Sequence, residues 1–489
     1  MERSLLFEPY VLTPLDHIIK HFYFSSFVSF PLHDPDVAVS ALKDGVERLV
    51  YALPTLSGAM VPSSRLPGKR NVIEIHPSPE SLEWIPMLQV KYHRDTTLVA
   101  TCSPRSSGGS YFDESWSSLP IIIPADRPSP VVRFQAHVFP DGILLCMTLT
   151  HAVFDGGGLG TILKMLATCC NNPPTHLPLS LPTSYAKEAS SRRVILDSAV
   201  PPSASNSEAY SRMFKSNDII PGLEKDVSSR RLSIPASNIR ALKDACNAAR
   251  PTNQEPILSK TDVLTALLAI CMNRARKSET NGLPSSLAVP VNLRKKFHPS
   301  LLDGYLGNTF ITLVVDIDPP AVHSAPRCGT TPFHADLNEL TALSLRIRKQ
   351  LILLDQKAYI GGLISYLQEQ SDWGATSVRF SDITVSSLRD LGINGLDFGP
   401  VIGQVNSFDM QSGMYPGICD ILPTRASHKD DTEGMNMSEP PTDVAITLED
   451  SAWSAFMEDS LMLWALNVGY RETGERALRV ADTVGQPKI

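Results

Sequence analysis

The chain has 489 residues, which exceeds the size at which a single hydrophobic core stops growing, so two domains are expected. Hydrophobic residues make up 43% of the chain and charged residues 19%, a composition that is ordinary for a globular protein. The formal net charge of −7 argues against a nucleic-acid-binding protein, because such a protein needs a basic face.

The sequence also argues against secretion, membrane insertion and metal binding. Residues 1–23 contain acidic residues, Pro14 and His17 where a signal peptide would have a basic cap before an apolar run. No stretch is long and apolar enough to span a bilayer. The eight cysteines fit neither the paired spacing of a zinc site nor a dense disulfide framework. We therefore expect reduced cysteines, no metal and a cytoplasmic protein.

The first organised part of the chain is residues 12–16 (LTPLD), and a helical pattern follows over residues 39–53. Apolar residues recur there at the spacing of one helix face, which predicts a helix that packs on a core. The residues of this apolar stripe are Leu42, Val46, Leu49 and Val50.

Residues 131–150 predict two strands joined by a tight turn. Apolar residues alternate from Val132 to Val138, and the segment 140–142 (PDG) has turn chemistry. Residues 143–150 are almost wholly apolar, as in a central strand that is buried on both faces. His151 follows directly, and glycines at 156–158 precede a second helical pattern. The predicted order is strand, histidine, tight glycine turn and helix.

The later part of the chain contains a connecting segment, a helix and a loop. Residues 171–221 are rich in proline, serine and asparagine and show little periodicity, so we predict a long crossover between two domains. Residues 260–276 show an apolar stripe that predicts a helix. Residues 424–442 are polar and mixed in charge, which predicts a mobile loop.

The spacing H-x-x-x-D occurs twice, and alone it is weak evidence of a site. His137 and Asp141 lie on the alternating strand and in the turn after it, which indicates a polar residue on a strand face. His151 and Asp155 instead follow a buried strand and precede glycines, which allow a sharp turn and a close approach of a ligand. Functional sites are common at such strand ends, so His151 is the candidate for catalysis.

The segment around His151 also resembles the signature of a known family. Residues 150–157 (THAVFDGG) are similar to the signature of the BAHD acyltransferases, coenzyme-A-dependent enzymes of plant and fungal specialised metabolism. The resemblance runs over nearly the whole chain and is strongest to the fungal branch that includes the trichothecene 3-O-acetyltransferases. The other segments that resemble family motifs are 12–16 (LTPLD), 53–58 (LPTLSG), 259–266 (SKTDVLTA), 291–294 (VNLR), 305–308 (YLGN), 386–390 (SSLRD) and 396–399 (LDFG).

This resemblance implies an α/β fold of two similar chloramphenicol-acetyltransferase-like halves, each a mixed sheet with flanking helices, joined by a long crossover. We assign residues 1–190 to the N-terminal half with the H-x-x-x-D motif, 191–225 to the crossover linker, and 226–489 to the C-terminal half with the D-F-G-type motif. The site would lie in a channel between the halves, with acyl-CoA entering from one mouth and a small-molecule acceptor from the other. We expect no permanently bound cofactor and a monomer.

The resemblance also implies roles for single residues. His151 would be the general base that takes the proton of the acceptor. Asp155 would pair with Arg294 and hold the turn formed by Gly156 and Gly157.

Four further positions are candidates through their motifs. Asp397 belongs to the D-F-G-type motif, so we count it with His151 as a candidate site residue but expect it to be structural. Ser386 and Ser387 are candidates for contacts with acyl-CoA and the oxyanion. Lys260 lies where family members hold the nucleotide phosphates.

The predicted reaction is acylation, by default acetylation, of a hydroxyl on a small specialised metabolite in a ternary complex. No G-x-S-x-G elbow and no cysteine next to His151 provides a protein nucleophile. The alternatives are an N-acyltransferase and an altered fold member that binds or cyclises its ligand. A condensation domain shares the fold, but Thr150 replaces the first histidine of its motif. Leu388 and Pro400 replace family tryptophans, so the acceptor cannot be inferred from the resemblance.

Overall fold

The computed structural model describes most of the chain. The described residues are 7–19, 21–102, 112–123, 127–171, 180–214, 225–277, 285–297, 304–318, 333–378, 381–425 and 439–466. Most of the loop predicted at 424–442 lies outside these ranges, so its mobility stays a prediction. Every cysteine within them is free, and Cys169 is buried while Cys170 is half-buried, as expected for small apolar side chains.

The N-terminal half is built on a five-stranded mixed sheet. The two strands and the turn predicted at residues 131–150 are confirmed, and the second strand is buried along its whole length. Neighbouring strands run antiparallel except for the parallel pair at one edge, β5 and β7. In spatial order the strands are β13 (Ser407–Met410), β2 (Tyr23–Pro31), β8 (Gly142–Thr150), β7 (Val132–Phe139) and β5 (Leu88–Tyr92).

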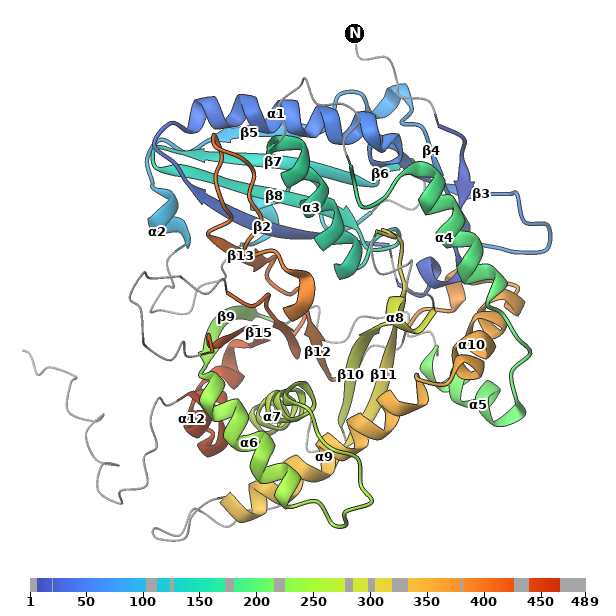
Figure 1. Cartoon of the computed structure of the whole chain (residues 1–489), viewed down its shortest axis with the longest axis vertical. Coiled ribbons are helices and arrows are strands. Elements are labelled where there is room, and N and C mark those ends of the chain that lie inside the picture. The colour runs from blue at the N-terminus through green and yellow to red at the C-terminus, as the bar shows by residue number, and fades with distance from the viewer. Residues whose placement is uncertain are drawn as a thin grey trace, which may run out of the picture.

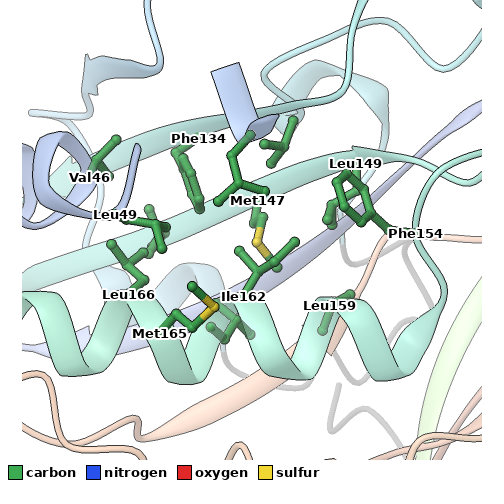
Figure 2. Close-up of a cluster of buried hydrophobic side chains, with 14 of the residues drawn as sticks. Val46, Leu49, Phe134, Met147, Leu149, Phe154, Leu159, Ile162, Met165 and Leu166 are labelled. Atoms are coloured by element: carbon green, nitrogen blue, oxygen red, sulfur yellow. The ribbon is translucent and has the colours of Figure 1, made fainter. Parts of the chain in front are cut away.

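Two helices, α1 (Pro35–Ala52) and α3 (Gly156–Asn171), cover one face of this sheet (Figure 1). The side chain of Asp34 accepts the Val37 N–H and caps the first turn of α1. The predicted apolar stripe of α1 is buried, and Figure 2 shows it meeting α3 and the sheet in a single core. The residues labelled there are Val46, Leu49, Phe134, Met147, Leu149, Phe154, Leu159, Ile162, Met165 and Leu166.

The C-terminal half is built on a six-stranded mixed sheet. The strands in spatial order are β11 (Phe310–Ile317), β10 (Ser285–Asn292), β12 (Ile383–Ser387), β14 (Ile418–Ile421), β15 (Thr442–Glu449) and β9 (Val227–Ile234). The predicted helix α7 (Lys260–Ala275) begins with a reciprocal capping box between Ser259 and Asp262. Nearly all its residues are buried, because it packs between this sheet, α6 (Ala236–Ala248) and α9 (Phe333–Leu353).

Several elements were not foreseen. The segment predicted to be an irregular crossover contains two helices, α4 (Tyr185–Asp197) and α5 (Ala204–Met213). A third sheet, antiparallel and four-stranded, consists of β1 (Tyr10–Val11), β4 (Val72–His76), β3 (Ala59–Ser63) and β6 (Ser129–Pro130). The remaining helices are α2 (Leu98–Cys102), α8 (Arg294–Phe297), α10 (Lys357–Glu369), α11 (Trp453–Glu458) and α12 (Ser460–Leu466). Among the described helices, none has the length and apolar character that crossing a membrane requires.

The predicted fold class is confirmed: each half is a mixed sheet with flanking helices. The halves are nevertheless not separate in sequence. Strand β13 belongs to the C-terminal part of the chain, yet it pairs with β2 in the N-terminal sheet, where Phe408 lies opposite Val28 (Figure 1). The domain limits at 190 and 226 stay a prediction.

Candidate active site

A cavity of about 310 Å³ lies between the two halves and is lined by both of them. The N-terminal half contributes Phe22 just before β2, Phe24 within β2, and the segment that follows β8. The C-terminal half contributes one face of its sheet and the segment 410–415. A molecule in this cavity would therefore be in contact with both halves of the chain.

Strand alternation decides which C-terminal residues face the cavity. In β12 and β14, Ile383, Val385, Cys419 and Ile421 point away from it and pack in the core around α7. The residues between them point the other way because successive side chains alternate across a sheet. The residues of this sheet that line the cavity are Ala288, Pro290, Asn292, Phe310, Thr312, Thr384, Ser386, Ser387, Ile418 and Asp420, of which Ser387 is the last residue of its strand.

His151 lies at the end of β8 and lines the cavity. Its backbone N–H donates to the Phe22 carbonyl at 2.9 Å, and its carbonyl accepts from the Asn308 amide Nδ2 at 2.9 Å. Aromatic rings surround the imidazole: the ring centroids of Phe22, Phe24 and Phe310 lie 5.3, 4.8 and 5.7 Å from its centroid. The imidazole is thus held between both halves in an apolar setting.

This setting determines the protonation of His151. Its Nδ1 atom is buried and has no hydrogen-bond partner among the described residues. Burial lowers the pKa of His151 below its ordinary value of 6.5, although the adjacent backbone of His151 and Phe154 and the Asp155 carboxylate act in the opposite direction. The imidazole is therefore neutral at pH 7, with a lone pair available as a base.

The motif at 12–16 holds the backbone next to His151. The Asp16 carboxylate accepts the N–H and hydroxyl of Thr13, both at 2.7 Å, and also accepts the Asn308 N–H at 2.9 Å. Burial raises the pKa of Asp16 to about 6, against the effect of these hydrogen bonds. Three motifs that are distant in sequence thus meet, because Asn308 connects Asp16 to the His151 carbonyl.

The expected pair of Asp155 and Arg294 is present and buried. The guanidinium donates from Nη1 and Nη2 to the two carboxylate oxygens at 2.9 and 2.8 Å. Asp155 also accepts the N–H groups of Gly158 and Thr309, and Arg294 also donates to the Tyr305 and Gly307 carbonyls. Burial alone would raise the pKa of Asp155, but Arg294 and these hydrogen bonds hold it below its ordinary value. The pair joins the start of α3 to the C-terminal half.

The glycines after Asp155 act differently from the prediction. They form the first turn of α3, and none of them has a positive φ. They are required because other chain segments approach closely: a Cβ on Gly157 would lie 2.4 Å from Nη1 of Arg294, and one on Gly158 would lie 2.2 Å from the Leu306 carbonyl oxygen. On Gly156 it would lie 2.9 Å from the Leu388 side chain. The predicted tight turn is therefore wrong, because the glycines accommodate a helix packed against Arg294 and Leu306.

Asp397 lies outside the residues that line the cavity. Its side chain is exposed, and its Oδ1 accepts the N–H of Gly399 at 2.9 Å, which closes a tight turn. Gly399 has φ of +91°, and a Cβ there would lie 2.8 Å from the Cα of Asn171 at the end of α3. The turn therefore packs closely against the C-terminal end of α3.

Of the three residues predicted to contact acyl-CoA, two line the cavity and one does not. Ser386 and Ser387 line the cavity at the end of β12. Lys260 does not line it, and its Nζ donates to both carboxylate oxygens of Glu439 at 2.6 and 2.7 Å. Its contact with coenzyme A phosphates stays a prediction.

His137, the other histidine at this spacing, lies on strand β7 as predicted and does not line the cavity. It is fully buried and contacts His93 and the Trp116 carbonyl, so it is a core residue. Asp420 was missed. It lines the cavity from β14, and burial raises the pKa of its carboxyl to about 7. An acid within the otherwise apolar run of residues 418–422 was the signal that could have identified it.

Comparisons with family models and curated proteins agree with this geometry. A model of the Transferase family matches residues 117–438, and a model of the trichothecene 3-O-acetyltransferase-like N-terminal domain matches residues 23–170. The communesin N16 acyltransferase of Penicillium expansum is 74% identical over 95% of this chain and 99% of that protein. The fumigaclavine B O-acetyltransferase of Aspergillus fumigatus is 34% identical over the same shares of each chain. These matches confirm the resemblance to the BAHD acyltransferases and their fungal branch.

Solved structures show the same fold. TRI101 of F. graminearum, complexed with coenzyme A and deoxynivalenol, has a TM-score of 0.68 at 17% identity, covering 92% of this chain and 96% of that one. Vinorine synthase has a TM-score of 0.58 at 13% identity, covering 93% of each chain. The family model, the relatives and the fold together show that this chain belongs to the Transferase family and is an acyltransferase.

Proposed function

We propose that this acyltransferase moves an acyl group from acyl-CoA to a nitrogen or oxygen nucleophile of a small fungal metabolite, with His151 as the general base. The observation that carries this proposal is the position of His151, which lines the cavity between the halves and whose pKa is lowered by burial. Since Nδ1 is buried in protein, Nε2 is the nitrogen available to a substrate. The structural neighbours complexed with coenzyme A support the choice of donor.

The proposed reaction transfers one proton through His151 and breaks the C–S bond of one thioester. His151 takes the N–H or O–H proton of the acceptor while the heteroatom attacks the thioester carbonyl. The new C–N or C–O bond forms, and the C–S bond breaks as the tetrahedral oxyanion collapses. The thiolate leaves and receives the proton from His151, which gives free coenzyme A and a neutral base. Ser386 and Ser387 are the cavity residues we propose as contacts for the thioester and the oxyanion.

Direct transfer is supported by the surroundings of His151. Within the described residues, no serine or cysteine side chain is hydrogen bonded to its imidazole. No cysteine is among the described residues that line the cavity, and Cys419 on β14 points into the core around α7. A covalent acyl-enzyme needs a nucleophile next to a base. The donor and the acceptor would therefore be bound together.

Nitrogen is the acceptor atom we favour, because the relative that is 74% identical over nearly the whole chain is named as an N16 acyltransferase. A hydroxyl is the second candidate, because a relative at 34% identity is named as an O-acetyltransferase. The position of His151 serves either atom, since both lose one proton as they attack.

One experiment tests the reaction and the acceptor atom. The metabolite that accumulates in a strain lacking the gene is purified and incubated with the enzyme and acetyl-CoA. We expect free thiol and acylated product in equal amounts, with an amide carbonyl in the NMR spectrum of the product. An ester would favour the second candidate. A product without thiol release would instead indicate a cyclising protein and would contradict the proposal.

A second experiment tests the order of events. Initial rates measured against both substrates should give intersecting lines, and acetyl-CoA alone should leave the mass of the intact protein unchanged. Parallel lines together with an added acyl mass would show that a protein nucleophile carries the group.

A further inference from the structure

Asp420 is a carboxylate that the described structure leaves without a partner. It is placed on the cavity-facing side of β14, next to Ser386 on β12. No hydrogen bond or ion pair connects its side chain to any other described residue, and no lysine or arginine is among the described residues that line the cavity. The other carboxylate there, Asp155, is paired with Arg294.

The positively charged residue on the same row of this sheet, Arg231, is already ion-paired with two other carboxylates. Asp420 lies opposite Ala445 on β15, and Ala445 lies opposite Arg231 on β9. Arg231 donates to Asp409 at 2.7 Å and to Asp443 at 2.8 Å. The protein thus pairs the neighbouring acids with a cation and leaves Asp420 facing the cavity.

We propose that Asp420 determines specificity by binding a positively charged nitrogen of the acceptor inside the active-site cavity, an inference that rests on the proposed function of this cavity as the acceptor site. This nitrogen is not the atom that is acylated, because a protonated amine has no lone pair for attack. The substrate class is therefore small molecules with a basic amine in addition to the nucleophilic nitrogen or hydroxyl.

Two features of the cavity favour a cation over other occupants. An anionic group would be repelled by the carboxylate, and a neutral apolar group would leave it buried without a partner, which is costly. One aromatic residue of the cavity, Tyr415, lies close enough to Asp420 that burial and this carboxylate together raise the pKa of its hydroxyl, and ring faces attract cations. The burial that raises the pKa of Asp420 to about 7 is the desolvation that a bound ammonium would offset.

The test measures binding without an acyl donor, so that its result is independent of turnover. The probes are 2-(2-naphthyl)ethylamine, which is protonated at pH 7, and 2-(2-naphthyl)ethanol, which has the same ring and a neutral end. Dissociation constants are measured by calorimetry for the full chain and its variants. We expect the wild type to bind the amine about tenfold to a hundredfold more tightly than the alcohol.

The variants separate charge from shape. Asp420→Asn keeps the shape and removes the charge, so its amine preference should fall to about twofold or less, while Asp420→Glu should keep most of the preference. Asp44→Asn makes the same charge change at an exposed position of α1 and should keep the wild-type ratio. Thr384→Val, which alters a cavity-facing polar residue without altering charge, should keep that ratio too.

Two results would overturn the proposal. One is equal affinity of the wild type for the amine and the alcohol, which needs no variant and so holds even if Asp420→Asn fails to fold. The other is a wild-type amine preference in folded Asp420→Asn. Thiol release with the native acceptor is the separate readout for the proposed function: its absence alongside a normal amine preference would count against the reaction but not against this site.

Discussion

At the scale of single residues, the imidazole of His151 is buried, and its Nδ1 atom has no hydrogen-bond partner among the described residues. Burial lowers its pKa and so favours the neutral form that can accept a proton. Replacing it by alanine removes the base but no buried hydrogen bond of its side chain. We expect His151→Ala to lose about 10²- to 10⁴-fold in kcat/KM while the thermal midpoint stays close to that of the wild type. His33→Ala is the matched control because His33 is exposed, and it should keep full activity. A folded His151→Ala enzyme with near-normal turnover would exclude the histidine as the base.

The pH dependence of the reaction follows from the lowered pKa of His151. The imidazole must be neutral to accept a proton, so activity is lost as the pH falls through the pKa of the folded enzyme. Since that pKa lies below 6.5, we expect kcat/KM, measured with an acceptor whose nucleophilic atom does not itself titrate in this range, to hold down to pH 6.5 and to decline only below it. Burial raises the pKa of Asp420 to about 7, so the profile should be measured in Asp420→Asn as well. An acid limb centred above 6.5 in that variant would contradict this assignment.

At the scale of elements, the ion pair of Asp155 and Arg294 joins the first turn of α3 to α8. Removing either partner leaves a buried charge alone. Asp155→Asn and Arg294→Met should therefore each lower the free energy of unfolding by about 3–5 kcal/mol. The double variant should cost less than the sum, because the second change removes the charge left by the first. Additive losses in urea unfolding would show that the two residues act independently.

The turn at Asp397 offers a second test at this scale. Its side chain accepts one backbone N–H, that of Gly399, and an asparagine can do the same. Asp397→Ala should therefore lower the free energy of unfolding by about 1 kcal/mol, whereas Asp397→Asn should be nearly neutral. The turnover of the folded enzyme should stay within about twofold in both. An inactive but stable Asp397→Asn would give this carboxylate a role in the chemistry.

The elements also show what the sequence could predict and why it could not predict more. Periodicity identified α1, β7, β8 and α7 because each has a local apolar pattern that matches its burial. The same patterns could not show that Gly157 and Gly158 accommodate Arg294 and Leu306, since these contacts join residues far apart in sequence. Asp420 was missed for a related reason. Its proposed role depends on whether a lysine or arginine lies close enough to pair with it. Only the arrangement of the two halves determines which residues lie close to it.

At the scale of the whole molecule, the two halves are connected through β13 as well as through the crossover. Arg231 on β9 donates to Asp409 on β13, so a buried ion pair joins the six-stranded sheet to the strand that completes the five-stranded one. We expect calorimetry to show one cooperative unfolding transition, with equal calorimetric and van't Hoff enthalpies. Two resolved transitions would mean that each half is stable without the other.

Strand β13 also has a consequence for how the chain is made. While the ribosome is synthesising the protein, β2 and β8 emerge early, but the partner for the outer edge of β2 appears only when residue 410 has been added. At an elongation rate of about 5–20 residues per second this delay is tens of seconds. For that time the nascent chain carries an open, largely apolar strand edge, which is a template for pairing with other chains. Translation speed and chaperone supply should therefore limit the yield of active enzyme in a foreign host.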